Sequence, residues 1–96
     1  MRTGINPKVI KEIRELAQRH EIQKVLLFGS RARGDFERAS DIDLAVTGGD
    51  YFQFALDVEE ETSTLLMYDI VNLDGAVNEE LRQSIQREGI VVYEKI

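Results

Sequence analysis

Apolar residues recur along this 96-residue chain with two alternating periods, and this alternation restricts the folds that it can form. Residues 7–20 carry an apolar stripe at helical spacing, and Asn6-Pro7 suits a helix N-cap followed by the first helical position. Val25–Phe28 then makes a short continuous apolar run, which is typical of a strand buried on both faces. A helix and a buried strand within so short a chain favour one layered core.

The rest of the chain continues the alternation. Residues 42–46 alternate apolar and other side chains as a strand does, after a loop at 29–40 that has room for one helical turn after Ser30. Further along, the pattern predicts a helix at 50–62, a strand at 65–73, a helix marked by Val77, Leu81 and Ile85, and a strand at 90–93. The expected inner face of the helix at 50–62 is Phe52, Ala55, Leu56 and Val58. The predicted fold class is α+β (mixed α/β), one domain over residues 1–96 with helices packed on a mixed sheet of about four strands.

Composition excludes several classes of function. The chain has no Cys and a single His, His20, so disulfides, thiol chemistry and zinc–thiolate sites are excluded and any metal must bind carboxylates. The longest apolar runs are four residues, against roughly 20 for a membrane helix, and the N-terminal residues lack the apolar core of a signal peptide. We therefore expect a soluble, cytoplasmic protein with no membrane partner. A net charge of −6 argues against stable binding of long nucleic acids.

The charge is unevenly divided along the chain. Residues 1–40 hold nine Lys and Arg against five Asp and Glu, whereas residues 41–96 hold three against thirteen. The sign of the charge therefore changes at Ser40. The charged residues at this junction are Arg31, Arg33 and Arg38, followed by Asp41 and Asp43. Most of the other charges are expected to lie on solvated faces, so the functional hypothesis concerns the junction.

Asp41-x-Asp43 is the sharpest local feature. Two carboxylates at alternate strand positions point to the same side, about 6.5–7 Å apart along the backbone, close enough to share a divalent cation. The alternatives are acidic strand ends that only aid solubility, and the metal-binding motif of nucleotide-sugar enzymes. Asp69 lies in an otherwise apolar strand, so we expect it to be partly buried and to need an arginine, a loop to cap or a metal. If the two strands are neighbours, three carboxylates meet, which suits Mg²⁺.

Gly29-Ser30 follows the buried strand directly. A glycine there lets the backbone approach a ligand, and a helical turn after it would offer free N–H groups and a hydroxyl to an anion. Arg31 and Arg33 come next, and their guanidinium groups suit phosphate oxygens. Alone, Gly29-Ser30 is only a turn signal, but beside an acidic metal site it fits a nucleoside triphosphate bound with Mg²⁺. Ser40 either contacts phosphate or caps the turn into the following strand.

The motifs combine into a longer pattern. L-F-G-S-R-A-R-G at residues 27–34 is followed by S-D-I-D-L at 40–44 and by the further strand carboxylate Asp69. This pattern, with ten residues between Ser30 and Asp41, resembles the DNA polymerase beta-like nucleotidyltransferase superfamily. The length and the lack of an added helical domain are similar to its minimal nucleotidyltransferases, which are commonly encoded beside a helical HEPN-type partner. The resemblance covers the chain from the first helix to the last strand.

The resemblance implies how a nucleotide would bind. Gly29 and Ser30 would contact the β- and γ-phosphates of a nucleoside triphosphate, and Arg33 and Arg31 would neutralise them. ATP, the superfamily's commonest donor, is the expected substrate.

The resemblance also implies the catalytic groups. Asp41 and Asp43 would hold Mg²⁺ that bridges the triphosphate. Asp69 would complete the second site of a two-metal centre and act as base toward the attacking hydroxyl. The fold implied is the nucleotidyltransferase fold, and the products implied are a nucleoside monophosphate ester and pyrophosphate.

By the same resemblance, the expected activity is Mg²⁺-dependent transfer of AMP from ATP to a hydroxyl of a protein or small molecule. A HEPN-type helical protein is the expected acceptor, which would make this chain the antitoxin of a toxin–antitoxin pair and part of a hetero-oligomer. Two alternatives stay open. One is a non-catalytic nucleotide-binding module that neutralises its partner by complex formation, and the other is a nucleotide-sugar enzyme.

Four other positions are interpreted as structural. His20 is expected to be a solvated helix end or a partner of the helix dipole, and not a base. Tyr51, Phe52 and Phe54 form an aromatic group that is expected to lie in the core, the alternative being that one ring stacks on a nucleobase or on a partner helix. None of the four is assigned to the chemistry.

Overall fold

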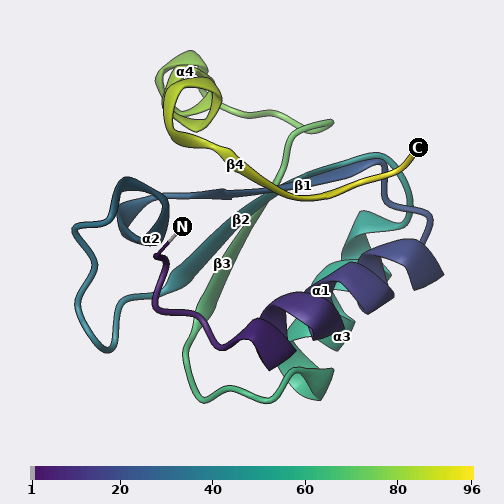
Figure 1. Ribbon diagram of the computed structural model, residues 1–96. Coiled ribbons are helices and arrows are strands. Elements are labelled where there is room, and N and C mark those ends of the chain that lie inside the picture. Colours follow the sequence, from purple (N-terminus) through teal and green to yellow (C-terminus); the bar gives the residue numbers. More distant parts are fainter. Residues whose placement is uncertain (1) are drawn as a thin grey trace.

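The computed structural model describes residues 2–96 and places helices and strands in alternating order along them (Figure 1). The helices are α1 (Pro7–Arg19), α2 (Ser30–Arg33), α3 (Tyr51–Glu61) and α4 (Glu79–Glu88). The strands are β1 (Lys24–Phe28), β2 (Ile42–Thr47), β3 (Tyr68–Asn72) and β4 (Ile90–Glu94). This order confirms the α+β class and the helical turn that starts at Ser30.

The strands form one mixed sheet in the order β3-β2-β1-β4. β1 is antiparallel to its neighbours β2 and β4, whereas β2 and β3 run parallel. The C-terminal end of β1 therefore lies beside the N-terminal end of β2, where Phe28 pairs with Asp43. β3 is an edge strand, and its first residue, Tyr68, pairs with Ile42 at the start of β2. One end of the sheet thus gathers the turn after β1 and the starts of β2 and β3.

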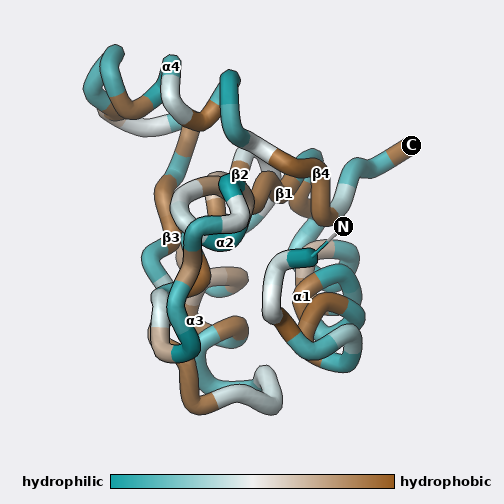
Figure 2. The backbone as a smooth tube through the Cα atoms, turned by 60° about the vertical axis from the view of Figure 1, so that its left-hand side comes forward, coloured by the Kyte–Doolittle hydropathy of each residue, from teal (hydrophilic) through white to brown (hydrophobic). Residues whose placement is uncertain are grey.

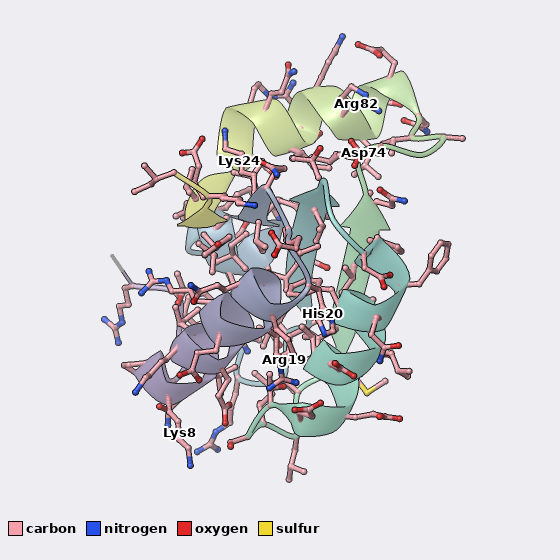
Figure 3. All side chains as sticks on the ribbon, turned by 90° about the vertical axis from the view of Figure 1, so that its right-hand side faces the viewer. Lys8, Arg19, His20, Lys24, Asp74 and Arg82 are labelled. Carbon is pink, nitrogen blue, oxygen red and sulfur yellow. The ribbon has the colours of Figure 1, made fainter. Side chains whose placement is uncertain are left out.

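Helices cover the two faces of the sheet unequally. α1 and α3 lie side by side on one face, and α4 lies on the other (Figures 1 and 3). The larger core lies under α1 and α3, where buried Ile13 and Phe54 pack with Leu44 of β2. The smaller core, under α4, consists of Phe28, Ala45 and Ile85. Figure 2 shows the same division, with hydrophobic strands inside and hydrophilic turns on the outer side of α1.

α1 forms where the sequence predicts it. The Asn6 side chain accepts a hydrogen bond from Lys8 N (2.8 Å), and Pro7 occupies the start of the helix, so the helix is capped. The buried stripe consists of Val9, Ile13, Leu16 and Ala17. Within residues 2–96, none of the helices has the length and hydropathy needed to cross a membrane.

α3 is rotated about its axis relative to the sequence prediction. Phe52 and Leu56 are 79% and 47% exposed, so two of the four residues predicted to face the core point outward, and the core role expected for Phe52 is wrong. The buried residues of α3 are Phe54, Asp57 and Val58. Tyr51, Phe54 and Val58 recur at helical spacing and form the apolar stripe that meets the core, and the Tyr51 hydroxyl donates to Ile70 O (2.7 Å) at the edge of β3.

His20 is an interior partner, and its interpretation as a solvated helix end is wrong. Its Nε2 lies 2.7 Å from Asp57 Oδ2, and only 13% of its side chain is exposed. Gln53 Nε2 donates to the other oxygen, Asp57 Oδ1 (2.9 Å), and Arg19 Nη1 lies 3.8 Å from Oδ2. This polar cluster joins the end of α1 to α3.

Replacing Asp57 with Asn should lower the stability of the fold at neutral pH. Hydrogen bonds from His20 and then Gln53 hold the pKa of Asp57 below its ordinary value. The carboxylate therefore stabilises the folded chain above its unfolded pKa of roughly 3.9, and this contribution is lost as the pH falls through the lower, folded pKa. Urea unfolding midpoints of the wild type and Asp57→Asn should differ at pH 7 and converge once the pH lies below both pKa values. Glu60→Gln, exposed on the same helix, is the control, and a difference for Asp57→Asn that did not change with pH would contradict this account.

β3 begins later than predicted. The strand spans Tyr68–Asn72, whereas the expected strand covered residues 65–73, and Leu65 and Met67 are exposed. The chain after α3 is tied to α1, because Glu12 accepts hydrogen bonds from Ser63 N and Ser63 Oγ, both 2.7 Å. Regular pairing with β2 starts at Tyr68, after this fixed connection.

Candidate active site

The three carboxylates predicted to carry the chemistry lie toward one end of the sheet. Asp43 in β2 pairs in register with Asp69 in the parallel neighbour β3. Asp41 directly precedes β2, two residues before Asp43. Asp43 is on the α4 face of the sheet, because Phe28, which pairs with Asp43, packs in the core under α4. The sequence hypothesis that the two acidic strands are neighbours is therefore confirmed.

Electrostatics link the three carboxylates. Burial, together with the negative charges of Asp69 and then Asp41, raises the pKa of Asp43 to about 6, while the charges of Arg33 and Arg31 oppose the rise. Asp43 is thus the central group, with a like charge on either side. Carboxylates held this way favour a cation between them, and their oxygens are the ligands that Mg²⁺ prefers.

The donor set fits a hard divalent cation, although the side chains are not gathered around one point. Among residues 2–96, no group of three or more carboxylate, imidazole or thiol side chains is arranged to hold a metal ion as it stands. Asp41 and Asp69 are exposed, and exposed side chains change rotamer within nanoseconds. Joint binding of an ion by the three carboxylates would therefore require rotation of these side chains.

Asp69 is exposed, and the prediction that it is partly buried is wrong. The reason is how far α4 extends over the sheet. Val71, two residues further along the same face of β3, packs against the core that contains Ile85 of α4. Asp69 lies beyond that cover on the edge strand. Its carboxylate needs no buried partner and is open to an incoming group.

Gly29 joins β1 to α2 in a conformation that glycine adopts far more readily than other residues. Its φ is 75° and its ψ is −158°. A methyl group on its α-carbon would overlap the Asp43 carboxylate, so the backbone of this turn passes directly against the central acid. Gly29 O accepts hydrogen bonds from Ala32 N (3.1 Å) and Arg33 N (3.0 Å), and α2 starts at Ser30. The leading N–H groups of such a turn have no partners within the helix.

Arg31 is buried, and its contacts favour a structural role over the phosphate contact predicted for it. Only 1% of the residue is exposed. Its nitrogens donate to three backbone oxygens, namely Nη1 to Thr3 (3.0 Å), Nη2 to Arg38 (3.2 Å) and Nε to Ser40 (3.0 Å). The guanidinium also lies over the Phe36 ring, 5.0 Å from its centroid. Arg31 therefore fixes the loop that leads directly into Asp41.

Arg33 is the exposed arginine of the turn. Its Nε lies 3.3 Å from Asp35 Oδ2, and its Nη1 lies 3.1 Å from Glu88 Oε2 at the end of α4. The hydrogen bond to Glu88 and, to a smaller extent, the one to Asp35 raise the pKa of Arg33. Because its charge also lowers the pKa of Asp43, Arg33 acts on the acidic cluster. Glu88 is a neighbour that the sequence did not predict, since nothing in the pattern indicates that the end of α4 reaches the glycine turn.

Ser40 caps the loop before β2. Its Oγ accepts a hydrogen bond from Glu37 N (2.8 Å), and its own N–H donates to Glu37 O (3.1 Å). Two roles were considered for Ser40, and its hydrogen bonds with Glu37 correspond to the capping role. A contact between Ser40 and phosphate stays a prediction.

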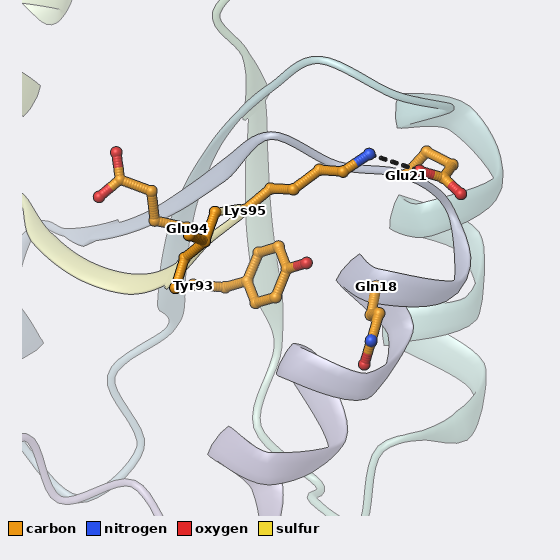
Figure 4. Close-up of a pocket in the computed structure, with 6 residues that line it drawn as sticks. Gln18, Glu21, Tyr93, Glu94 and Lys95 are labelled. Atoms are coloured by element: carbon orange, nitrogen blue, oxygen red, sulfur yellow. Dashed lines mark hydrogen bonds and ion pairs between the residues drawn. The ribbon is translucent and has the colours of Figure 1, made fainter.

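A separate hollow of about 570 Å³ lies at the other end of the sheet (Figure 4). The residues that line it are Gln18, Glu21, Tyr93, Glu94, Lys95 and Ile96. Because Glu94 pairs with Lys24 at the start of β1, the hollow adjoins the end of β1 that lies away from Gly29. Lys95 Nζ donates to Glu21 Oε2 (2.7 Å), so two of the charged groups that line the hollow are paired with each other. The hollow is not part of the carboxylate site.

The chain matches a known protein family over most of its length. The family described as "Polymerase beta, Nucleotidyltransferase" matches residues 11–96, which include the glycine turn and all three carboxylates. A Methanocaldococcus jannaschii protein, to which protein adenylyltransferase activity is ascribed, is 36% identical over 84 residues. This match covers 78% of the present chain and 82% of the relative.

Solved structures from toxin–antitoxin systems share the fold. A toxin–antitoxin structure with AMP-PNP has a chain that matches with a TM-score of 0.66 and 25% identity, covering 90% of this chain and 73% of that chain. A chain of the MntA–HepT toxin–antitoxin structure matches with a TM-score of 0.65, covering 91% of this chain and 71% of that chain. Its identity is 22%, so this second likeness supports the fold alone.

Proposed function

The chain belongs to the polymerase beta nucleotidyltransferase family, and from this premise we propose that it uses Mg²⁺ and ATP to transfer AMP to a hydroxyl of a partner protein. The observation that carries the proposal is the position of Asp43. It lies between two further carboxylates and directly against the Gly29 backbone, so the proposed cation site would adjoin the proposed phosphate site. Those are the two requirements for binding a nucleoside triphosphate.

The three carboxylates have distinct parts in the proposed reaction. Asp41, Asp43 and Asp69 would hold Mg²⁺, which supplies neutralisation of the triphosphate charge and stabilisation of the entering and leaving oxygens. With a pKa of about 6, Asp43 is mostly ionised at pH 7 and is available as a ligand. Asp69 is exposed at the sheet edge, where its carboxylate can accept the proton of an incoming hydroxyl.

The transfer step is an in-line displacement. The acceptor oxygen forms a bond to the α-phosphorus of ATP while the bond from that phosphorus to the oxygen bridging the β-phosphorus breaks. The acceptor keeps AMP as an ester, pyrophosphate leaves, and Asp69 takes the hydroxyl proton. Gly29, Ser30 and Arg33 would hold the β- and γ-phosphates that become the leaving group, because the turn offers free N–H groups and Arg33 is exposed.

The proposed acceptor is the toxin of a toxin–antitoxin pair, with this chain as the antitoxin in a hetero-oligomer. Support comes from a structural neighbour at 25% identity that is a toxin–antitoxin structure containing AMP-PNP, and from the protein adenylyltransferase activity ascribed to the archaeal relative. The motif resemblance to minimal nucleotidyltransferases adds that the toxin is a helical HEPN-type protein.

The proposal is tested with the protein encoded next to this chain. The two proteins are co-expressed, purified and incubated with ATP and Mg²⁺, and intact-mass spectrometry follows the partner. The partner should gain the mass of one or more AMP groups with wild-type protein and with Glu80→Gln, an exposed control on α4, but not with Asp41→Asn plus Asp43→Asn. Undiminished transfer by the double variant would contradict the proposal. If Asp43→Ala still binds the partner and still neutralises its toxicity, the chain is a binding module.

A further inference from the structure

Apolar side chains are exposed along the side of the molecule where α3 meets β3. Phe52 and Leu56 of α3 are 79% and 47% exposed, and Met67, just before β3, is 68% exposed. Glu59 follows on the same side of α3 and, with Leu66, Met67 and Tyr68, lines a groove of about 240 Å³. We call Phe52, Leu56, Glu59, Leu66 and Met67 the α3–β3 surface. An isolated exposed apolar residue is ordinary, whereas such a run beside a groove is typical of a protein contact.

The α3–β3 surface is firmly attached to the edge of the sheet. The Tyr51 ring packs edge-on against Phe52 with centroids 5.3 Å apart, and the Tyr51 hydroxyl donates to Ile70 O on the outer edge of β3. At the other end, the connection from α3 to β3 runs along the lower rim of the molecule in Figure 1, and Thr62 Oγ1 lies 2.8 Å from the Tyr68 hydroxyl. The exposed side chains therefore stand on an ordered scaffold, which reduces the entropy lost on docking.

The charges that α3, β3 and the connection between them carry are all negative. Residues 39–81, which contain all of α3 and β3, have eleven Asp and Glu and no Lys or Arg. Glu59 and Glu60 are exposed on α3, and Asp69 is exposed on β3. A second copy of this chain, docked through the same surface, would bring these carboxylates against each other, which is unfavourable. The complementary occupant is an apolar protein face flanked by Lys and Arg.

The α3–β3 surface adjoins Asp69, the proposed catalytic base. Met67 directly precedes the edge strand and Asp69 is the second residue of that strand, so the two lie close together along the chain, and both are exposed. A protein seated on Met67 would therefore lie beside the Asp69 carboxylate. Resting on the function proposed above, we propose that the α3–β3 surface docks the acceptor protein through a basic-rimmed apolar face, and that this docking brings the acceptor hydroxyl to Asp69.

The test separates docking from chemistry. Phe52→Ser plus Met67→Ser removes the two most exposed anchors without opening the core, and Ile96→Ser, an exposed apolar residue at the other end of the molecule, is the matched control. Adenylylation of the co-encoded partner is measured as a function of partner concentration. The double variant should raise the KM for the partner about tenfold or more, which corresponds to about 1.4 kcal/mol or more of lost docking free energy, with kcat at saturating partner and the KM for ATP unchanged. Glu59→Gln plus Glu60→Gln should slow association and flatten its salt dependence.

Each outcome of this test has a defined meaning. If the wild type transfers AMP but Phe52→Ser plus Met67→Ser leaves the KM for the partner unchanged, the docking surface is wrong and the proposed function stands. No transfer by the wild type to its co-encoded partner overturns the function, and with it the role of the surface in presenting an acceptor. Sedimentation of this chain alone is the second measurement. Self-association that Phe52→Ser plus Met67→Ser abolishes would show that a second copy, and not a basic partner, occupies the surface.

Discussion

Asp43→Asn is expected to reduce kcat/KM for AMP transfer by about 10³-fold, in keeping with the loss of one preorganised electrostatic group in an active site. Asn keeps the shape of the side chain but removes the central negative charge of the acidic cluster. Rates are measured at saturating ATP and Mg²⁺, with Glu80→Gln as the control for a charge lost elsewhere on the surface. A variant that kept more than a tenth of the wild-type rate would contradict the central place given to Asp43.

The same substitution should leave the fold more stable, which separates an effect on chemistry from unfolding. The pKa of Asp43 is raised to about 6 in the folded chain, so at neutral pH the folded state bears the cost of an ionised, half-buried carboxylate. This cost grows as the pH rises from the unfolded pKa of roughly 3.9 to the folded pKa, and is absent below both. In metal-free buffer, urea midpoints should be higher for Asp43→Asn than for the wild type at pH 7, and equal at low pH. A lower midpoint at pH 7 would mean that Asp43 stabilises the fold.

Gly29→Ala is expected to abolish transfer and to destabilise the fold by about 1–3 kcal/mol, the usual cost of a residue held in a region of φ and ψ that it avoids. The new methyl group would also overlap the Asp43 carboxylate and move either the turn or the acid. Both groups belong to the proposed site, so the effect on kcat/KM should exceed about 100-fold, in line with the sensitivity of catalysis to small displacements.

Gly34→Ala is the matched control for Gly29→Ala. Gly34 has a φ of 93° at the end of α2, so the backbone strain is of the same kind, but in the described chain the added methyl group would meet no atom within 4 Å beyond its local backbone and chain neighbours. Gly34→Ala should therefore lower stability and keep most of the transfer activity. Equal activity in the two variants would show that the approach of Gly29 to Asp43 has no bearing on the reaction. Circular dichroism and urea unfolding establish that both variants are folded when assayed.

The sequence predicted most of the fold because its elements have simple periodicity. The stripe on α1 and the alternation on β2 each depend on local spacing, and both elements formed as expected. The family also follows from a short motif, Gly29-Ser30 with Asp41 and Asp43 at a fixed distance, and the match over residues 11–96 confirms it. These features are local in sequence, so no knowledge of tertiary contacts was needed.

The errors arose where a distant contact determines a local property. Asp69 is exposed because the core under α4 reaches only as far as Val71 on β3. The residues around Asp69 do not indicate how far α4 covers the sheet. The burial of Arg31, whose Nη1 donates to Thr3 O, was also not predicted, because the polar segment around it has no periodicity that indicates burial, whereas its contact with phosphate stays a prediction. The helix α3 offers two apolar stripes, one with Phe52 and Leu56 and one with Tyr51, Phe54 and Val58, and only the tertiary structure decides which of them meets the core.

Transfer of the α-phosphate of ATP tests the central claim most directly. The chain and its co-encoded partner are incubated with Mg²⁺ and ATP that carries the label on either the α- or the γ-phosphorus. The account predicts that α-label enters the partner, that γ-label is released as pyrophosphate, and that EDTA or Asp41→Asn plus Asp43→Asn prevents both. Incorporation of γ-label into the partner, or α-label incorporation that survives the loss of both carboxylates, would contradict it.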